Sequence, residues 1–451
     1  MTVDTLLVSG GTPLVGEIAV RGAKNLVPKA MVAALLGDEP TRLNNVPRIR
    51  DVEIVRRLLE LHGVSVQEVH PDDGEAPDAR EAGGTSLLLD PSHVERAATA
   101  DIEVHAGSSR IPILFCGPLL HRLGRAFIPD LGGCKIGDRP INFHLDALRR
   151  FGAVVDKRPE GLEISAPAGL HGALIELPYP SVGTTEQVLL TAVLAKGVTE
   201  LRNAAVEPEI IDLICMLQKM GAIITLETDR VLRITGVERL GGCTHDALPD
   251  RIETASWACA ALATGGEIFV RKARQADLMT FLNVYRRVGG AFEVTSEGIR
   301  FWHPGNELDA LALETDVHPG FMTDWQQPLV VALTQATGLS IVHETVYENR
   351  LGYTKALVEL GAHIQVYSEC LGATPCRFGR RSFQHSAVIS GPSTLRGADL
   401  EIPDLRGGFS YIIAALTAQG DSKVRGIGIF QRGYENFLTK LERLGADFDA
   451  F

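Results

Sequence analysis

Six segments of the chain repeat one pattern, in which the end of an amphipathic helix is followed by a glycine and then by a β-prone run. A glycine directly after a helix can adopt the left-handed conformation that closes it. Successive copies are about 70 to 90 residues apart, which is too long for a common solenoid repeat and long enough for a module with two helices and several strands. The sequence therefore predicts six α/β modules, grouped as two domains of three. The repeated glycines are Gly63, Gly152, Gly221, Gly289, Gly361 and Gly445.

The first copy also indicates where its helix begins. Asp51 is placed to cap the N-terminus, because aspartate readily accepts from the free N–H groups of a first turn. Val52, Val55, Leu58 and Leu59 then fall on one face at helical spacing. That face is expected to be buried.

Composition restricts the classes of protein. The 451 residues are 45% hydrophobic and 22% charged, which is ordinary for a globular protein. A net charge of −12 argues against a general nucleic-acid binder. The first eleven residues lack the basic and apolar parts of a secretory signal, and the longest apolar run, 111–120, is too short to span a bilayer. We therefore expect neither a nucleic-acid partner nor membrane insertion.

Seven scattered cysteines suit the reducing cytoplasm, which is the expected location. Cys370 and Cys376 flank a loop and could bind a metal or pair under oxidation. No second cysteine pair or histidine cluster stands at zinc spacing, so no metal site is expected. Glycine-rich nucleotide motifs and zinc-hydrolase or serine-hydrolase motifs are also absent from the sequence.

The segment 132–140, GGCKIGDRP, places a thiol in a glycine-rich loop between cations. Lys135 and Arg139 favour the thiolate form of Cys134 and would attract anions to it. An incidental loop thiol explains the same residues equally well, since a lone cysteine motif does not transfer between families.

Other charged residues recur next to glycines or polar neighbours. Lys24 precedes an alanine-rich helix, where a bound anion would explain a cation. Asp324 precedes an apolar run and could be a helix cap. Arg350, Arg406 and Arg432 each lie near an acidic residue in the sequence. Taken singly, each arginine is explained by a surface ion pair, which contributes little stability.

Taken together, these residues resemble the enolpyruvyl transferase family, in its branch that acts on UDP-N-acetylglucosamine. The resemblance runs from about Gly10 to Phe448, and the wording is most similar to enzymes of high-GC Gram-positive bacteria. It rests on nine motifs that occur in the family's order: GAKN (22–25), GGCKIGDRP (132–140), PSVGTTE (180–186), EPEI (207–210), LPDRIET (248–254), GFMTD (320–324), ETVYENR (344–350), DLR (404–406) and RGYE (432–435).

The resemblance implies an α/β fold of two lobes, built from six βαβαββ units, three per lobe, with helices inside and sheets outside. It assigns residues 24–248 to a first lobe with a mobile cysteine loop, and residues 1–23 and 249–451 to a second lobe with the base. The active site is then expected in the cleft between the lobes.

The resemblance also implies a reaction. The enolpyruvyl group of phosphoenolpyruvate passes to the 3-hydroxyl of UDP-N-acetylglucosamine by addition and elimination, with release of phosphate and without a cofactor. This is the first committed step of peptidoglycan precursor synthesis, on which cell shape and division depend. A positioned acid and base and several cations are needed for such chemistry.

Residue roles follow from the matching motifs. Cys134 takes part in proton transfer and can be alkylated by fosfomycin, Asp324 is the base, and Lys24 and Arg406 complete the catalytic set. Phosphoenolpyruvate is bound by Lys24, Arg139, Arg406 and Arg432, with Arg350 as a further cation. The UDP-sugar is bound by Asn25, Arg110, Arg139, Pro140, Ile141, Asn142, Phe143, Ser181, Val182, Gly183, Asp324 and Val346.

Two alternatives stay open. Asn142 replaces a frequent aspartate and Tyr179 an occasional lysine, so the acceptor could be another uridine nucleotide such as UMP, as in secondary metabolism. A catalytically silent UDP-sugar binding paralogue is the other alternative. His144 is interpreted as orienting the cysteine loop rather than as catalytic. The sequence does not predict the oligomeric state or the role of the insertion 369–384.

Overall fold

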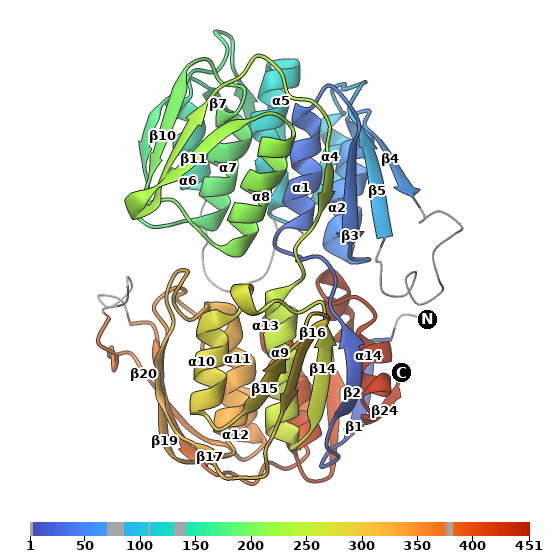
Figure 1. Ribbon diagram of the computed structural model, residues 1–451, viewed down its shortest axis with the longest axis vertical. Coiled ribbons are helices and arrows are strands. Elements are labelled where there is room, and N and C mark those ends of the chain that lie inside the picture. Colours follow the sequence, from blue (N-terminus) through green and yellow to red (C-terminus); the bar gives the residue numbers. More distant parts are fainter. Residues whose placement is uncertain (1–2, 70–84, 107–108, 130–140, 375, 377–381) are drawn as a thin grey trace. The chain divides into compact units, whose positions relative to one another are not determined.

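Six modules of the predicted kind make up the computed structural model, which describes residues 3–69, 85–106, 109–129, 141–374, 376 and 382–451 (Figure 1). Contacts divide these residues into two compact units. The first unit comprises the described parts of Arg21–Gly133 and Arg139–Leu248. The second unit comprises the described parts of Met1–Val20 and Pro249–Phe451.

The first unit contains three modules, each with one small sheet. One module consists of α1 (Val27–Ala33), β3 (Thr41–Val46), α2 (Arg50–Leu61), β4 (Ser65–Val69), β5 (Thr85–Asp90) and β13 (Thr244–Asp246). The next has α4 (Thr99–Ala106), η2 (Ile111–Phe115), α5 (Cys116–Leu123), β6 (Arg125–Pro129), α6 (Asn142–Arg150), β7 (Val154–Arg158) and β8 (Gly161–Ser165). The third is β9 (Leu174–Glu176), α7 (Val182–Ala192), β10 (Val198–Arg202), α8 (Pro208–Lys219), β11 (Ile223–Glu227) and β12 (Val231–Thr235).

The second unit repeats this plan. Its first module is β2 (Val15–Ala19), α9 (Arg251–Thr264), β14 (Glu267–Arg271), α10 (Met279–Arg287), β15 (Ala291–Val294) and β16 (Gly298–Trp302). The next is β17 (Leu308–Asp309), β18 (Ala312–Glu314), α11 (Thr323–Leu333), β19 (Ala336–His343), α12 (Thr354–Glu359), β20 (His363–Tyr367) and β21 (Ser386–Gly391). The last is β22 (Asp399–Glu401), α13 (Leu405–Thr417), β23 (Asp421–Arg425), η5 (Ile427–Arg432), α14 (Phe437–Arg443), β24 (Asp447–Ala450) and β1 (Thr5–Ser9).

Several of the sheets share one topology, whereas the sheet of β6, β8 and β7 has three strands, all antiparallel. In the module of α7 and α8, β10 pairs in parallel with β9 and antiparallel with β12, and β12 pairs antiparallel with β11. The parallel pair is joined by the crossover helix α7, as parallel strands require. The modules of α9 and α13 have the same strand order, which explains why the sequence signal recurs.

The repeated glycines do what the sequence predicts. Each follows a helix and precedes a strand, and each has a positive φ, between 78° for Gly445 and 107° for Gly221. Val55 and Leu59 of α2 are fully buried, as predicted. The predicted capping role of Asp51 is wrong, because α2 begins at Arg50 and has no side-chain cap.

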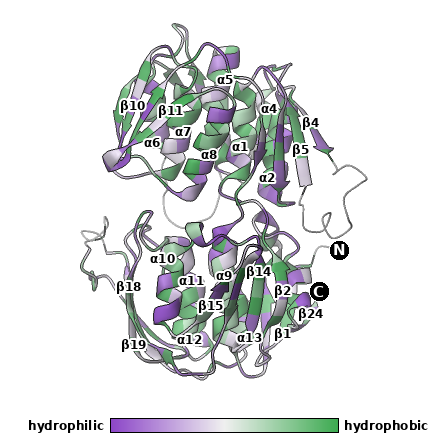
Figure 2. Cartoon of the chain, in the orientation of Figure 1, coloured by the Kyte–Doolittle hydropathy of each residue, from purple (hydrophilic) through white to green (hydrophobic). Residues whose placement is uncertain are grey.

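Helices lie inside each unit and sheets cover them. In α9, all residues from Arg251 to Ala263 are buried, and Figure 2 shows hydrophobic residues along most of this helix. Strands such as β1 instead alternate between buried and partly exposed residues. A helix buried on all sides and a sheet with one solvated face are the expected results of this layering.

The predicted insertion 369–384 contains no helix or strand in its described part. Residues 70–84 lie outside the described residues. Within the described ranges, no helix has the length and apolar character needed to cross a bilayer.

Candidate active site

The helices α9, α11 and α13 of the second unit pack against one another, and charged side chains lie where these helices begin. Asp324 is the second residue of α11, and Arg406 is the second residue of α13. Arg350 donates to the Asp324 carboxylate, and its Nη1 lies 3.9 Å from Asp404. Asp404 in turn caps α13 by accepting from the backbone N–H of Arg406 at 3.0 Å. The two helix starts are therefore joined through one buried guanidinium.

Arg406 is 6% exposed and makes an unusual set of contacts. Its Nη1 donates to the Tyr434 hydroxyl at 2.9 Å, while its Nη2 is buried and has no hydrogen-bond partner among the described residues. Burial lowers the pKa of Arg406, but nearby Tyr434, Asp250 and Asp324 outweigh this effect and raise it overall. A charged, buried N–H group without a partner is suited to an anion.

Asp324 lies beside a cation at the start of a helix. Its side chain is 16% exposed, and the buried Arg350 guanidinium contacts one of its oxygens. The first turn of a helix also favours a carboxylate. The capping role considered for Asp324 is wrong, since α11 begins after Met322 without a side-chain cap. The surface ion pairs considered for Arg350 and Arg406 are also wrong, because both side chains are buried.

Two further predicted residues belong to the second unit. Val346 lies in the segment after β19, is 9% exposed, and donates its backbone N–H to Glu344 at 2.7 Å. Arg432 is the last residue of η5 and is partly exposed. It stands two residues before Tyr434, the partner of Arg406.

In the first unit, Lys24 and Asn25 precede α1. Lys24 Nζ lies 2.9 Å from the carboxylate of Asp51, which is only 2% exposed. Lys29 donates to the backbone oxygen of Asn25 and lies 3.4 Å from Glu186 of α7. Asp51 thus contacts a predicted substrate-binding lysine instead of capping its own helix.

The remaining predicted residues of the first unit stand at the starts of helices. Arg110 precedes η2, and Ile141, Asn142 and Phe143 begin α6. Ser181 caps α7 by accepting from Thr184 N–H at 3.3 Å, and Val182 and Gly183 follow it.

His144 links two of these helix starts. A Cβ on Gly183 would come within 3.1 Å of His144 Nε2, so the start of α7 approaches the histidine closely. The pKa of His144 is lowered to about 4, mainly by burial and also by the Arg110 charge, with a Gln187 hydrogen bond opposing the shift. His144 is therefore neutral near pH 7, which suits an orienting role better than a charged catalytic one.

Cys134, Arg139 and Pro140 lie outside the described residues. The structure therefore brings together Asp324, Arg350 and Arg406 in the second unit and, in the first unit, Arg110 and Gly183 around His144, and it does not describe the cysteine loop.

Two buried glutamates were not singled out by sequence reasoning, although both stand in quoted motifs. Glu186 ends PSVGTTE, and burial raises its pKa to about 7. Glu344 begins ETVYENR and is fully buried. Their signal was weak because glutamate is common and its burial is not visible in a sequence.

The Cys370 thiol donates to Cys376 Sγ at 3.5 Å, and no disulfide joins the two residues. No group of three metal-binding side chains exists in the part of the chain that the structure describes.

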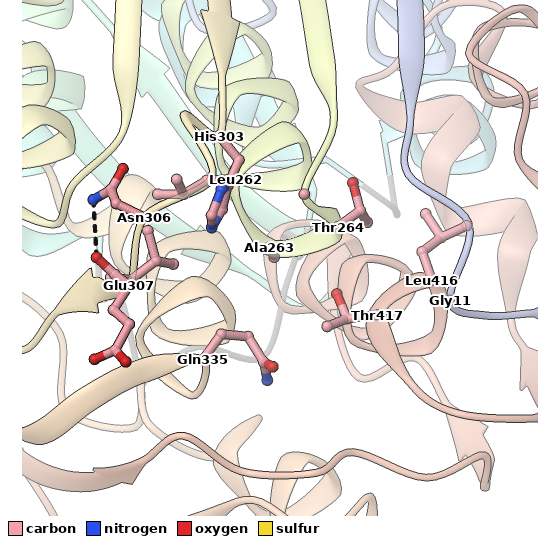
Figure 3. A pocket seen from close by; sticks show the side chains of 12 residues that line it. Gly11, Leu262, Ala263, Thr264, His303, Asn306, Glu307, Gln335, Leu416 and Thr417 are labelled. Carbon is pink, nitrogen blue, oxygen red and sulfur yellow. Dashed lines mark hydrogen bonds between the residues drawn. The ribbon is translucent and has the colours of Figure 1, made fainter.

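Figure 3 shows a pocket of about 330 Å³ elsewhere in the second unit. Thr264 and Thr417, which line it, are the last residues of α9 and α13. The pocket therefore lies at the opposite ends of these helices from Arg406. No arginine or lysine is among its described lining residues. It lacks the cations that a phosphorylated substrate needs.

Comparisons with known proteins agree with the motifs. The UDP-N-acetylglucosamine 1-carboxyvinyltransferase of Protochlamydia amoebophila is 48% identical over 98% of this chain and 94% of its own. Those of Chlamydia trachomatis and Azorhizobium caulinodans are 45% and 38% identical over 97% and 99% of this chain, and 96% and 99% of their own. The expected likeness to high-GC Gram-positive enzymes stays a prediction.

Solved structures confirm the predicted fold. The enolpyruvyl transferase NikO from Streptomyces tendae has a TM-score of 0.84 at 21% identity, covering 100% of this chain and 99% of its own. The EPSP synthase of Acinetobacter baumannii has a TM-score of 0.70 at 15% identity, covering 99% and 100%. The sequence also matches the EPSP synthase (3-phosphoshikimate 1-carboxyvinyltransferase) family over residues 8–441. The chain therefore belongs to this family of enolpyruvyl transferases.

Proposed function

We propose that this chain transfers the enolpyruvyl group of phosphoenolpyruvate to the 3-hydroxyl of UDP-N-acetylglucosamine, with release of phosphate. Relatives up to 48% identical over nearly the full chain carry the name UDP-N-acetylglucosamine 1-carboxyvinyltransferase. That name supports the UDP-sugar as acceptor over UMP. It also supports a role in peptidoglycan precursor synthesis.

The observation that carries the proposal is the pairing of an anion site with a base. Arg406 has a buried Nη2 without a partner among the described residues, and Asp324 acts electrostatically on the same guanidinium. Phosphoenolpyruvate supplies an anion for Arg406, and the sugar hydroxyl supplies a proton for Asp324. This arrangement of charges also disfavours a silent paralogue.

The remaining roles follow from the motifs. Lys24, Arg139, Arg432 and Arg350 join Arg406 in binding phosphoenolpyruvate. The UDP-sugar contacts Asp324 and Val346, together with residues of the helix starts and the cysteine loop. These are Asn25, Arg110, Arg139, Pro140, Ile141, Asn142, Phe143, Ser181, Val182 and Gly183.

The reaction proceeds in two balanced steps. Asp324 takes the proton of the sugar 3-hydroxyl as its oxygen forms a bond to C2 of phosphoenolpyruvate, while C3 gains a proton from Cys134. The bond from C2 to the phosphate oxygen then breaks, C3 returns a proton to the Cys134 thiolate, and the proton on Asp324 goes to the departing phosphate, giving the enolpyruvyl ether and phosphate. Cations around the phosphate stabilise the departing charge.

Phosphate release across several acceptors tests this function. We expect phosphoenolpyruvate to release phosphate with UDP-N-acetylglucosamine, and not with UMP or shikimate 3-phosphate. Release with UMP alone would show that the acceptor is wrong, and saturable UDP-sugar binding without turnover would show a silent paralogue.

We also propose that the enzyme works in the cytoplasm. The structure describes every cysteine except Cys134, and no disulfide joins the described ones, which suits a reducing compartment.

A further inference from the structure

Glu344 is a fully buried side chain that contacts two segments of the second unit, namely the start of α11 and residues 346–347. Its Oε2 accepts from the Thr323 hydroxyl at 2.8 Å and from Gln326 Nε2 at 3.3 Å. Its Oε1 accepts from the backbone N–H groups of Val346 at 2.7 Å and Tyr347 at 3.0 Å. Four donors thus meet at one carboxylate.

Three of these four donors need an acceptor oxygen on Glu344, whereas the Thr323 hydroxyl can also accept. The two backbone groups can only donate. Exchanging the oxygen and nitrogen of the Gln326 amide would break another hydrogen bond, because its Oε1 accepts from the Tyr353 hydroxyl at 2.8 Å. A glutamine at position 344 would turn an N–H group toward one of these donors, and a buried donor without an acceptor is costly.

Both segments lead to residues assigned to the acceptor. Thr323 is the first residue of α11 and directly precedes Asp324. Val346 is assigned to the sugar, and three residues after Tyr347 comes Arg350, which donates to Asp324. Glu344 therefore fixes the base and the sugar-contacting segment to one common point.

We propose that Glu344 is a positioning residue, which sets Asp324 and the Val346–Tyr347 segment at the spacing that the acceptor sugar requires. The inference rests on the proposed function. It assigns Glu344 no contact with substrate and no proton transfer.

The primary test is Glu344→Gln, with steady-state kinetics for both substrates. We expect the KM for UDP-N-acetylglucosamine to rise on the order of ten-fold, since a lost buried contact has that effect. The KM for phosphoenolpyruvate should change less than about three-fold, because the hydrogen bonds of Arg406 go to Tyr434 and Asp404 and Glu344 acts only on the charge of the further cation Arg350. A purely structural role would lower the melting temperature and the active fraction and leave both KM values unchanged.

Thr323 offers a milder test with a matched control. Thr323→Val keeps the shape of the side chain and removes one donor to Glu344, whereas Thr323→Ser keeps the hydroxyl. We expect the KM for UDP-N-acetylglucosamine to rise in the valine variant and to stay near the wild-type value in the serine variant. This pair decides the question even if Glu344→Gln does not fold.

The outcomes separate the two proposals. If the wild-type enzyme releases no phosphate with UDP-N-acetylglucosamine, the proposed function fails. If the wild type turns over and the acceptor KM is unchanged in Glu344→Gln, or equal in the two Thr323 variants, the positioning role is wrong.

Discussion

Glu186 should make the stability of the first unit fall as pH rises. Burial raises the pKa of this carboxyl from 4.5 to about 7, with Lys29 opposing the shift. The folded state therefore keeps its proton to a higher pH than the unfolded chain does. The stability from this group is complete below pH 4.5 and is lost as the pH rises to about 7. The difference between the two pKa values corresponds to a loss of about 3 kcal/mol in the free energy of unfolding.

Glu186→Gln isolates this contribution. Glutamine has nearly the same shape, does not titrate, and can still accept from Lys29. The difference in unfolding free energy between the variant and the wild type should change by about 3 kcal/mol between pH 4.5 and pH 7.5, in favour of the variant at the higher pH. Titrating groups that do not interact with Glu186 cancel in this difference; Glu207 and Glu209 do interact with it, as minor contributors to its pKa. Glu103→Gln, an exposed change in α4, should leave the difference constant.

The assay has to report on the first unit. The three tryptophans, Trp257, Trp302 and Trp325, all belong to the second unit, so their fluorescence would miss the effect. Amide hydrogen exchange in α7, corrected for intrinsic rates, reports locally. Parallel pH curves for Glu186→Gln and wild type would refute the reasoning.

Substitutions at three other positions test further parts of the account. Arg406→Ala should raise the KM for phosphoenolpyruvate about ten- to one-hundred-fold, because charge-assisted hydrogen bonds are lost, and should affect the UDP-sugar less; an unchanged KM for phosphoenolpyruvate would count against the anion site. Asp51→Asn should lower the free energy of unfolding by about 1 to 3 kcal/mol, since it weakens a buried contact with Lys24. Urea unfolding followed by circular dichroism measures this free energy. Asp38→Asn is the control, because Asp38 contacts Arg122 at the same 2.9 Å but is itself exposed. Equal losses of stability in the two variants would contradict the argument. Cys134→Ser should lose turnover, whereas Cys134→Asp should keep part of it and resist fosfomycin; a fully active serine variant would exclude the thiol as the acid.

The periodic features of the fold could be predicted from the sequence. The six glycines close helices because a positive φ is a local requirement that glycine meets at no steric cost. The buried face of α2 follows from helical spacing. Both properties depend on neighbours along the chain, so the sequence alone was sufficient to predict them.

Partners distant in sequence could not be predicted. Asp51 was expected to cap its own helix, and it pairs with Lys24 across α1 and α2. Arg350 was explained by neighbouring acids, yet it contacts Asp324 of α11. Asp404 does neighbour Arg406 but binds its backbone rather than its guanidinium. Local sequence shows which charges are near each other along the chain and not which ones share a buried site.

The two buried glutamates were missed for a related reason. Glu344 is recognisable only from four donors contributed by α11 and the Val346–Tyr347 segment. Glu186 is recognisable only from its burial against Lys29. The resemblance supplied substrate-facing residues, whereas supporting residues required the folded structure.

The most direct test of enolpyruvyl transfer by addition and elimination is product analysis after turnover in D2O. The proposed first step makes C3 of phosphoenolpyruvate a methyl group by taking a proton from the enzyme, and the second step removes one proton from it. NMR should therefore show phosphate and a vinyl ether on the sugar 3-oxygen, with deuterium at its C3. A vinyl ether free of deuterium, or an enolpyruvyl group on another oxygen, would contradict the account.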